Sequence, residues 1–141
     1  MRLSRHTDYA LRVLIHLAVR PDRLASIGEI ARAYGISENH LMKVVNMLAH
    51  AGLVRTVRGR GGGIALARPA KEISVGAVIR QSEPDLKLAE CGSCRIENAC
   101  GLTGAVGKAL GAFLKVLDSY SIADVTTKRD ELAALLGLER D

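Results

Sequence analysis

The stretch that decides the fold is Ser26-Ile27-Gly28-Glu29-Ile30-Ala31-Arg32-Ala33-Tyr34-Gly35-Ile36-Ser37-Glu38-Asn39-His40-Leu41-Met42-Lys43-Val44. Ser26 and Glu29 have the spacing of a capping box, so a short helix is expected directly after Ser26. Gly35 breaks this helix, and Ser37 is the N-cap of a second helix over about 38–51. A helix, a tight glycine turn and another helix together predict a helix-turn-helix.

The second of these helices has two different faces. Its apolar positions have the spacing of a buried helical stripe: Leu41, Val44, Val45 and Leu48. The other face carries amides, imidazoles, a cation and a methionine: Asn39, His40, Lys43, Asn46, Met47 and His50. Asparagine pairs with adenine edges in the major groove, and lysine reaches guanine or phosphate. This face predicts a DNA-reading surface, with a merely solvated face as the alternative.

A basic hairpin follows the two helices. Residues 53–57 and 64–67 have the pattern of two strands, joined by Arg58-Gly59-Arg60-Gly61-Gly62-Gly63. Glycines let a backbone approach phosphates closely, and Arg60 at the tip is suited to enter a minor groove. The hairpin is therefore predicted to be a wing beside the helix-turn-helix, a flexible glycine turn with scattered charge being the alternative.

The charge distribution favours a polyanionic partner. Residues 1–71 carry twelve Lys or Arg against four Asp or Glu, whereas residues 72–141 carry eight against eleven. A positive excess confined to one half of a chain is typical of nucleic-acid binding. We therefore expect double-stranded DNA as a partner. The candidate DNA-binding residues are Ser37, Asn39, His40, Lys43, Asn46, Arg58, Arg60, Gly61 and Gly62.

The composition excludes other classes. The longest apolar-rich run, residues 10–19, is interrupted by Arg12 and His16 and falls short of the roughly 18 residues of a membrane span. We expect no membrane partner and a cytoplasmic location. With no Trp and one Phe, the core must be built from Leu, Ile, Val and Ala, which favours helices. No Ser/His/Asp or paired-carboxylate constellation can be placed, so an enzyme is not expected.

All three cysteines lie in one loop, Glu90-Cys91-Gly92-Ser93-Cys94-Arg95-Ile96-Glu97-Asn98-Ala99-Cys100-Gly101. Thiolates so closely spaced on a glycine-containing loop can converge on one soft metal centre. Three sulfurs are one ligand short for tetrahedral zinc or an iron–sulfur cluster. The fourth ligand must come from elsewhere in the chain, from a second chain or from a small molecule. Core packing and a disulfide are the alternatives, the latter disfavoured by the odd count and the absence of a secretory signal.

Further helices are expected on both sides of these motifs. The first begins at Ser4 or Thr7 and runs to Val19, and a short one covers 75–81. Asp8 lies in the first turn of the first helix, where a carboxylate interacts favourably with the helix dipole.

A long helix is predicted after the cysteine loop. Apolar residues recur there at helix-packing spacing: Leu102, Val106, Ala109, Phe113, Val116 and Tyr120. Gly104, Gly107 and Gly111 weaken such a helix, which suggests a close backbone contact. This stripe predicts a dimer interface, with an intramolecular core helix as the alternative.

Four stretches carry a family resemblance: Thr7-Asp8-Tyr9-Ala10-Leu11-Arg12, the run from Tyr34 to Val44, the run from Val57 to Gly63, and Cys94 with Cys100. Over about residues 1–125 the chain resembles the bacterial winged-helix iron–sulfur transcriptional regulators of the NsrR/IscR type, most of all the NsrR-like nitric-oxide sensors. The interval between Cys91 and Cys94 is shorter than that family usually has. So short a chelate also suits zinc.

The resemblance implies a homodimeric repressor whose long helices cross. Its iron–sulfur cluster, 4Fe-4S in preference to 2Fe-2S, would be bound by Cys91, Cys94 and Cys100. Asp8 from the partner chain would be the fourth ligand, with the neighbouring His6 as the alternative. The signal would be nitric oxide, and the regulated genes those of nitrosative stress. A regulator of the same fold that senses iron or iron–sulfur status is the near alternative. A small zinc or iron–sulfur protein in electron transfer, with an acidic protein partner, is the distant one.

The expected fold is mainly α, a winged helix-turn-helix with a β-hairpin wing and a long C-terminal dimerisation helix. Three parts are expected along the chain. Residues 1–81 form the DNA-binding domain, residues 82–101 the cluster-binding loop, and residues 102–141 the dimerisation helix and tail.

Overall fold

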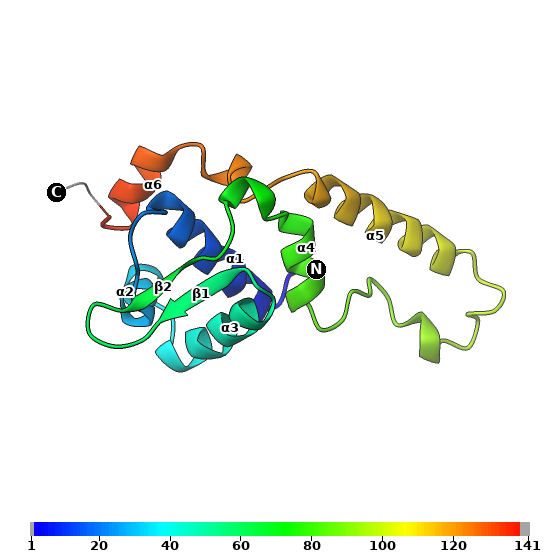
Figure 1. Cartoon of the computed structure of the whole chain (residues 1–141). Helices are drawn as coiled ribbons and strands as arrows, with labels where there is room; N and C mark the ends of the chain where they lie inside the picture. The colour runs from blue at the N-terminus through cyan, green and yellow to red at the C-terminus, as the bar shows by residue number, and fades with distance from the viewer. Residues whose placement is uncertain (1, 139–141) are drawn as a thin grey trace.

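The computed structural model describes residues 2–138, which form a helical head from which one long helix projects (Figure 1). The helices are α1 (Arg5–Val19), α2 (Ile27–Tyr34), α3 (Glu38–His50), α4 (Val75–Ser82), α5 (Leu102–Asp118) and α6 (Arg129–Leu135). The strands are β1 (Val54–Val57) and β2 (Gly63–Leu66), and short 3-10 helices cover Ala70–Glu72, Cys91–Ser93 and Asp124–Thr126. The predicted mainly helical fold with a hairpin wing is confirmed. The predicted parts 1–81 and 102–141 include residues 1 and 139–141, which lie outside the described residues.

Serine side chains cap the N-termini of α1, α2, α3 and α4. The side chains of Ser4, Ser26, Ser37 and Ser74 each accept a hydrogen bond from the amide three residues further on. Such caps satisfy backbone donors at a helix start and contribute about 0.5–2 kcal/mol each. Gly35 ends α2 in the left-handed conformation, with φ 65°, and its amide donates to the Ala31 carbonyl. The predicted helix–glycine turn–helix unit is therefore present.

The wing differs from the prediction by one residue in each strand. β1 begins at Val54 rather than at residue 53, because the Leu53 amide donates to the Leu48 carbonyl at the end of α3. β2 begins one residue early, since Gly63 pairs with Val57 across the antiparallel ladder.

The wing is fixed to the helix-turn-helix by a short bridge. Ala25, just before α2, and Ile64 in β2 exchange backbone hydrogen bonds of 3.0 and 2.7 Å. Both residues are buried. The hairpin therefore keeps a fixed position beside α2 and α3.

Helix α1 lies at the centre of the head and packs against α3 and α4. The predicted stripe of α3 is buried against it, and β2 and α4 complete the same core. Its fully buried large side chains include Val13, Leu14, Ile30, Leu41, Val44, Leu48, Ile73, Val78 and Ile79. Predicting α3 as an amphipathic helix with a Leu and Val face was therefore correct.

α5 joins the head only through its C-terminal half. Leu114 is buried, and Leu110 and Leu117 are partly buried against the same core. Close approach of α5 to α4 requires a glycine, because a Cβ on Gly76 would lie 2.0 Å from Oδ1 and 2.7 Å from the backbone nitrogen of Asp118. Arg80 of α4 also donates to the Asp118 carboxylate over 2.6 Å. This end of α5 is thus locked onto α4.

Replacing Gly76 by alanine is expected to lower the free energy of unfolding by about 1–3 kcal/mol, because the added methyl group forces α5 away from α4. Chemical denaturation followed by circular dichroism measures the change. Ala77→Ser, on the exposed side of the same helix, is the matched control and should stay within about 0.5 kcal/mol of the wild type. Equal stability of Gly76→Ala and the wild type would contradict the close α4–α5 contact.

The chain turns back to the head after α5. α5 ends at Asp118, so Tyr120, predicted as the last member of its stripe, lies beyond the helix. The reason is that the Tyr120 carbonyl accepts from the Val75 amide over 2.8 Å, which draws the chain to the start of α4. α6 then packs on α1, and Arg20 donates from Nε to the Leu138 carbonyl over 2.9 Å. Within the described residues, none of these helices is long and apolar enough to cross a bilayer.

Candidate functional site

The outer face of α3 is open to solvent. Asn39, Lys43 and Asn46 are exposed on it, and α3 and the hairpin lie along the lower side of the head in Figure 1, opposite α6. One residue of this face was assigned wrongly: Met47 is partly buried against the core, whereas Met42 is 51% exposed beside Lys43. Helical spacing could have identified Met42, which is three residues from Asn39.

His40 is half-buried against α1 instead of being fully exposed on the outer face. Its ring meets the ring of Tyr9 edge-on, with centroids 4.7 Å apart, and stacks on His6 at 6.3 Å. These three rings connect the start of α1 to the first turn of α3. No sequence pattern predicts this contact, because it joins helices that lie far apart along the chain.

The tip of the wing is a tight basic turn. Arg58 and Arg60 are exposed. Gly62 cannot be replaced without moving the turn, because a Cβ there would lie 2.1 Å from the Val57 carbonyl oxygen and 2.9 Å from that of Gly59. Gly61 and Gly62 keep the tip small, and Arg58 and Arg60 make it positively charged, which suits a phosphate backbone.

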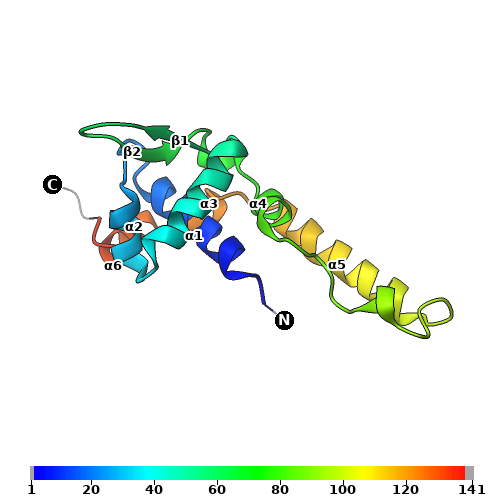
Figure 2. The same cartoon turned by 90° about the horizontal axis from the view of Figure 1, so that it is seen from below.

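The cysteine loop lies at the far end of α5 from the head, as Figure 2 shows. Cys91 begins a 3-10 turn, and the amide of Cys94 donates to the carbonyl of Cys91 over 3.0 Å. All three cysteines are free; Cys94 is exposed, and Cys91 and Cys100 are half-buried. Within residues 2–138, no three His, Cys, Asp or Glu side chains converge as a metal site.

The donor set of this loop nevertheless fits a soft metal centre. Three free thiols on one surface loop are the ligands that zinc or an iron–sulfur cluster takes. The loop also has space to close, since nothing lies within 4 Å of the Cβ positions of Gly92 and Gly101. The predicted ligands Cys91, Cys94 and Cys100 are thus accessible and close in sequence, while their sulfurs do not yet meet around one point.

Asp8 lies in the first turn of α1 and not beside the cysteines of its own chain. Arg12 orients it through two hydrogen bonds, from Nε to Oδ1 at 3.0 Å and from Nη2 to Oδ2 at 3.1 Å. The side chain of Asp8 remains 45% exposed. A carboxylate held in this way is available to a ligand or to a second chain.

Arg12 is itself fixed by two aromatic rings. Its guanidinium carbon lies 6.0 Å from the ring centre of Tyr9 and 5.6 Å from that of Tyr34. Burial raises the pKa of Tyr34 above its ordinary value of 10.0, an effect that the charge of Arg12 partly offsets. The phenol therefore stays protonated at neutral pH and donates to the Arg12 carbonyl over 3.4 Å.

The start of α1 is also clamped to the end of α4, where the segment that leads to the cysteine loop begins. The Ser4 amide donates to both oxygens of the Glu83 carboxylate, at 3.2 and 3.1 Å, and the Ser4 hydroxyl donates to Oε2 at 3.2 Å. The hydroxyls of Ser82 and Thr7 lie 2.9 Å apart beside this clamp, both buried. Because Glu83 is the first residue after α4, the segment that leads from α4 to the cysteine loop is anchored at its beginning to the start of the helix that carries Asp8.

Replacing Glu83 by alanine is expected to destabilise the head by about 1.5–3 kcal/mol, the range for hydrogen bonds to a charged group. Thermal unfolding of the purified protein measures it. Asp85→Ala removes an exposed carboxylate from the same segment and is the control. If both variants unfold at the same temperature as the wild type, the clamp contributes nothing to stability.

Three of the predicted dimer residues are exposed on the free face of α5: Leu102 and Val116 are 56% and 58% exposed, and Ala109 is exposed as well. Tyr120, beyond the end of α5, is 48% exposed. Gly104, Gly107 and Gly111 have no heavy atom within 4 Å of their Cβ positions. The close backbone contact that these glycines suggested is therefore not made by any part of residues 2–138.

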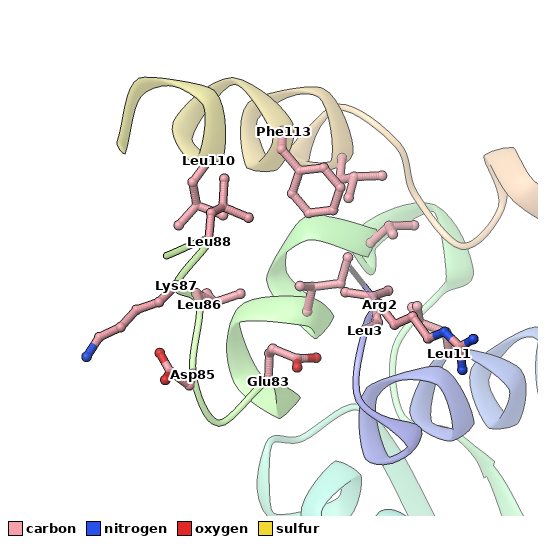
Figure 3. A pocket seen from close by; sticks show the side chains of 13 residues that line it. Arg2, Leu3, Leu11, Glu83, Asp85, Leu86, Lys87, Leu88, Leu110 and Phe113 are labelled. Atoms are coloured by element: carbon pink, nitrogen blue, oxygen red, sulfur yellow. The ribbon is translucent and has the colours of Figure 1, made fainter. Parts of the chain in front are cut away.

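Phe113 and Val106 instead line two cavities beside α5. Phe113 lines an apolar cavity of about 390 Å³ between α4, α5 and residues 83–88, with Leu110 and Leu88 beside it (Figure 3). Val106 lines a second cavity together with Cys91. Val106 thus lies at the border between the cysteine loop and the free face of α5, whereas Phe113 lies against residues 83–88.

The chain is similar to known transcriptional regulators over almost its whole length. It is 49% identical to the HTH-type transcriptional regulator NsrR of Oceanobacillus iheyensis and 45% identical to that of Halalkalibacterium halodurans, covering 99% of both chains in each case. The aligned lengths of 146 and 145 positions exceed the 141 residues of this chain, so these relatives carry residues that it lacks.

A solved structure described as T. potens IscR has the same fold, with a TM-score of 0.75 and 31% identity over 94% of this chain and 90% of the other. The family model of Rrf2, described as an iron-dependent transcriptional regulator, matches residues 3–128. The protein therefore belongs to the Rrf2 family of transcriptional regulators.

Proposed function

We propose that the protein is a DNA-binding transcriptional repressor that senses nitric oxide through an iron–sulfur cluster and controls genes of nitrosative stress. The observation that carries the proposal is the pairing of a basic winged head with three free thiols on one surface loop. The relatives named NsrR, at 45–49% identity, support the same function.

The proposed cluster ligands are Cys91, Cys94 and Cys100, with Asp8 of the partner subunit as the fourth. A carboxylate already oriented by Arg12 supports this assignment. A cluster bound there would supply iron that reacts with nitric oxide. We propose 4Fe-4S in preference to 2Fe-2S, with zinc as the alternative, since the short interval between Cys91 and Cys94 also suits a single metal ion.

The proposed DNA surface is the outer face of α3 with the tip of the wing. Asn39, Lys43 and Asn46 would read base edges, and Met42 is suited to contact a thymine methyl group. Ser37, Arg58, Arg60, Gly61 and Gly62 would contact the backbone of an operator. His40 is also proposed for this surface, in a role shared with its contact to Tyr9.

A homodimer would place two such heads on one operator. The proposed interface is the free face of α5 with its neighbours: Leu102, Val106, Ala109, Phe113, Val116 and Tyr120. Two heads reading one face of B-DNA must match half-sites roughly 34–36 Å apart. In this arrangement residues 1–81 bind DNA, residues 82–101 bind the cluster and residues 102–141 hold the dimer together.

The head offers a route from the metal site to the DNA surface. Asp8 accepts hydrogen bonds from Arg12, Arg12 contacts the ring of Tyr9, and Tyr9 contacts His40 at the start of α3. A change in the ligation of Asp8 would therefore act directly on the helix that packs against α3. This short chain of contacts would let the position of α3 depend on the cluster.

A sensor of iron or iron–sulfur status is the second candidate, favoured by the similarity to T. potens IscR. Anaerobic purification with visible absorption and analysis of iron, sulfide and zinc tests the metal proposal. Iron and sulfide in the ratio of a cluster, with a brown chromophore, is the expected result. A colourless protein with about one zinc per chain would contradict it. The response to nitric oxide then separates the two candidate signals.

A further inference from the structure

Two of the three cysteines are placed to react with each other. Cys91 and Cys94 are the first and fourth residues of a hydrogen-bonded 3-10 turn, closed by the 3.0 Å bond from the Cys94 amide to the Cys91 carbonyl. Cys91 begins the 3-10 helix and Cys94 caps its end in an extended conformation, so this hydrogen bond holds the two residues close together. The Cα atoms at the ends of such a turn lie within about 7 Å, near the 4.4–6.8 Å range that a disulfide spans.

The third cysteine is directed elsewhere. The sulfur of Cys100 accepts a hydrogen bond from the Leu102 amide, the first residue of α5, over 3.4 Å. The amide of Cys100 closes a separate turn by donating to the Ile96 carbonyl over 2.9 Å. Cys100 is thus tied to the start of α5, while Cys91 and Cys94 form a pair of their own.

The pair is accessible to small oxidants and reductants. Cys94 is exposed, Cys91 is half-buried, and both are free thiols. Gly92 lies between them with open space around its Cβ position, so the turn can adjust to a bond between the sulfurs. Within the described part of the loop, the hydrogen bond to a cysteine sulfur is the one that Cys100 accepts, so the sulfurs of Cys91 and Cys94 are not engaged in this way.

We infer that Cys91 and Cys94 are a redox-active dithiol that a hydroperoxide converts to an intrachain disulfide. One thiolate attacks a peroxide oxygen, the S–O bond forms as the O–O bond breaks, and the leaving oxygen takes a proton, which gives a sulfenic acid and releases water or an alcohol. The other thiolate then attacks that sulfur, the S–O bond breaks, and the oxygen leaves as water. Two thiols lose two electrons and two protons in total, and the peroxide is reduced by the same two electrons.

The disulfide would remove two of the three sulfur ligands from the loop. Oxidised protein should therefore fail to take up a cluster until a dithiol reductant restores Cys91 and Cys94. This consequence rests on the proposed cluster site, whereas the disulfide itself does not. Oxidation would then hold the protein in its cluster-free form after the metal has been lost.

The test uses the full-length protein, freed of metal with a chelator under reducing conditions and desalted anaerobically. Hydrogen peroxide is added, remaining thiols are blocked with N-ethylmaleimide under denaturing conditions, and intact mass counts the blocked groups. The count should fall from three to one, with Cys91 and Cys94 joined in the peptide map. Cys100→Ser should fall from two blocked thiols to none, and a dithiol should restore both.

Cys91→Ser and Cys94→Ser are the matched controls, because each removes one member of the pair and leaves two thiols. Both should keep two blocked thiols over the same time. A bridge that includes Cys100, bridges only between chains, or a Cys100→Ser variant that keeps both thiols would overturn the inference. Because this assay uses metal-free protein, its failure would leave the proposed cluster untouched. Absence of iron from the purified protein would equally leave the disulfide result standing.

Discussion

Replacing Cys94 by serine is expected to abolish cluster binding while leaving the head folded. Serine offers a hard, protonated hydroxyl in place of the thiolate that iron–sulfur clusters and zinc require. Since Cys94 is exposed and outside the core, its replacement removes a ligand and no packing. Iron and sulfide content should fall to background, and the thermal midpoint of the metal-free protein should stay that of the metal-free wild type.

Two further variants test whether the effect on the cluster is specific to the proposed ligand residues. Ser93→Ala, next to Cys94 and equally exposed, should keep the full cluster content. Asp8→Asn keeps the shape of the side chain and weakens it as a ligand, so it should alter the cluster spectrum or its lifetime while all three thiols remain. Full iron content in Cys94→Ser would show that the loop does not hold the cluster as proposed.

Replacing Lys43, proposed to read a base edge, or Arg60, proposed to contact the DNA backbone, by alanine is expected to weaken operator binding. For Lys43 the expected factor is about 5–150, the equivalent of roughly 1–3 kcal/mol for a lost base contact. Both side chains are exposed, so no loss of stability should accompany the change. If the lost contact is to phosphate instead of to a base, the salt dependence of binding should fall, with the slope of log K against log salt reduced by about 1. Fluorescence anisotropy at several salt concentrations distinguishes the two.

Lys108→Ala is the control for this experiment, because it removes an exposed cation of α5 rather than of the head. Its affinity should match the wild type, and all three variants should keep the wild-type visible spectrum. Unchanged affinity in both Lys43→Ala and Arg60→Ala would place the DNA surface elsewhere on the molecule.

Local rules were sufficient to predict the head. α1, α2, α3 and α4 each start with a serine whose hydroxyl accepts from the amide three residues on, and Gly35 has the positive φ that a tight turn demands. The buried stripe of α3 follows from helical periodicity alone. These features depend on neighbouring residues, so the sequence pattern determines them directly.

Contacts between distant residues could not be predicted in this way. The Ser4–Glu83 clamp joins positions 79 residues apart, and neither residue carries a motif. The placement of His40 against Tyr9 and the turn of Tyr120 toward Val75 depend likewise on how helices pack. Met47 was misassigned because its position borders both faces of α3, and only packing against the core decides which it joins.

The free face of α5 could be predicted from the sequence only in part. Its periodicity predicted a packed stripe, whereas the α5 residues that pack against the core are the neighbouring Leu110, Leu114 and Leu117. This face of α5 combines exposed apolar residues with three glycines that have open space at their Cβ positions. An exposed apolar face of this kind marks an interaction site more often than a surface that stays in water. The proposed homodimer would cover it.

Anaerobic titration of the cluster-loaded protein with nitric oxide, while absorbance and operator binding are recorded together, tests the proposed sensor most directly. Loss of the cluster absorbance and release of DNA at the same, near-stoichiometric amount of nitric oxide is the predicted result. A change from about 99% to 1% of operator occupied corresponds to roughly 5.5 kcal/mol between the two states. Operator binding that persists after the cluster absorbance is lost would contradict the proposal that the cluster controls the DNA-binding head.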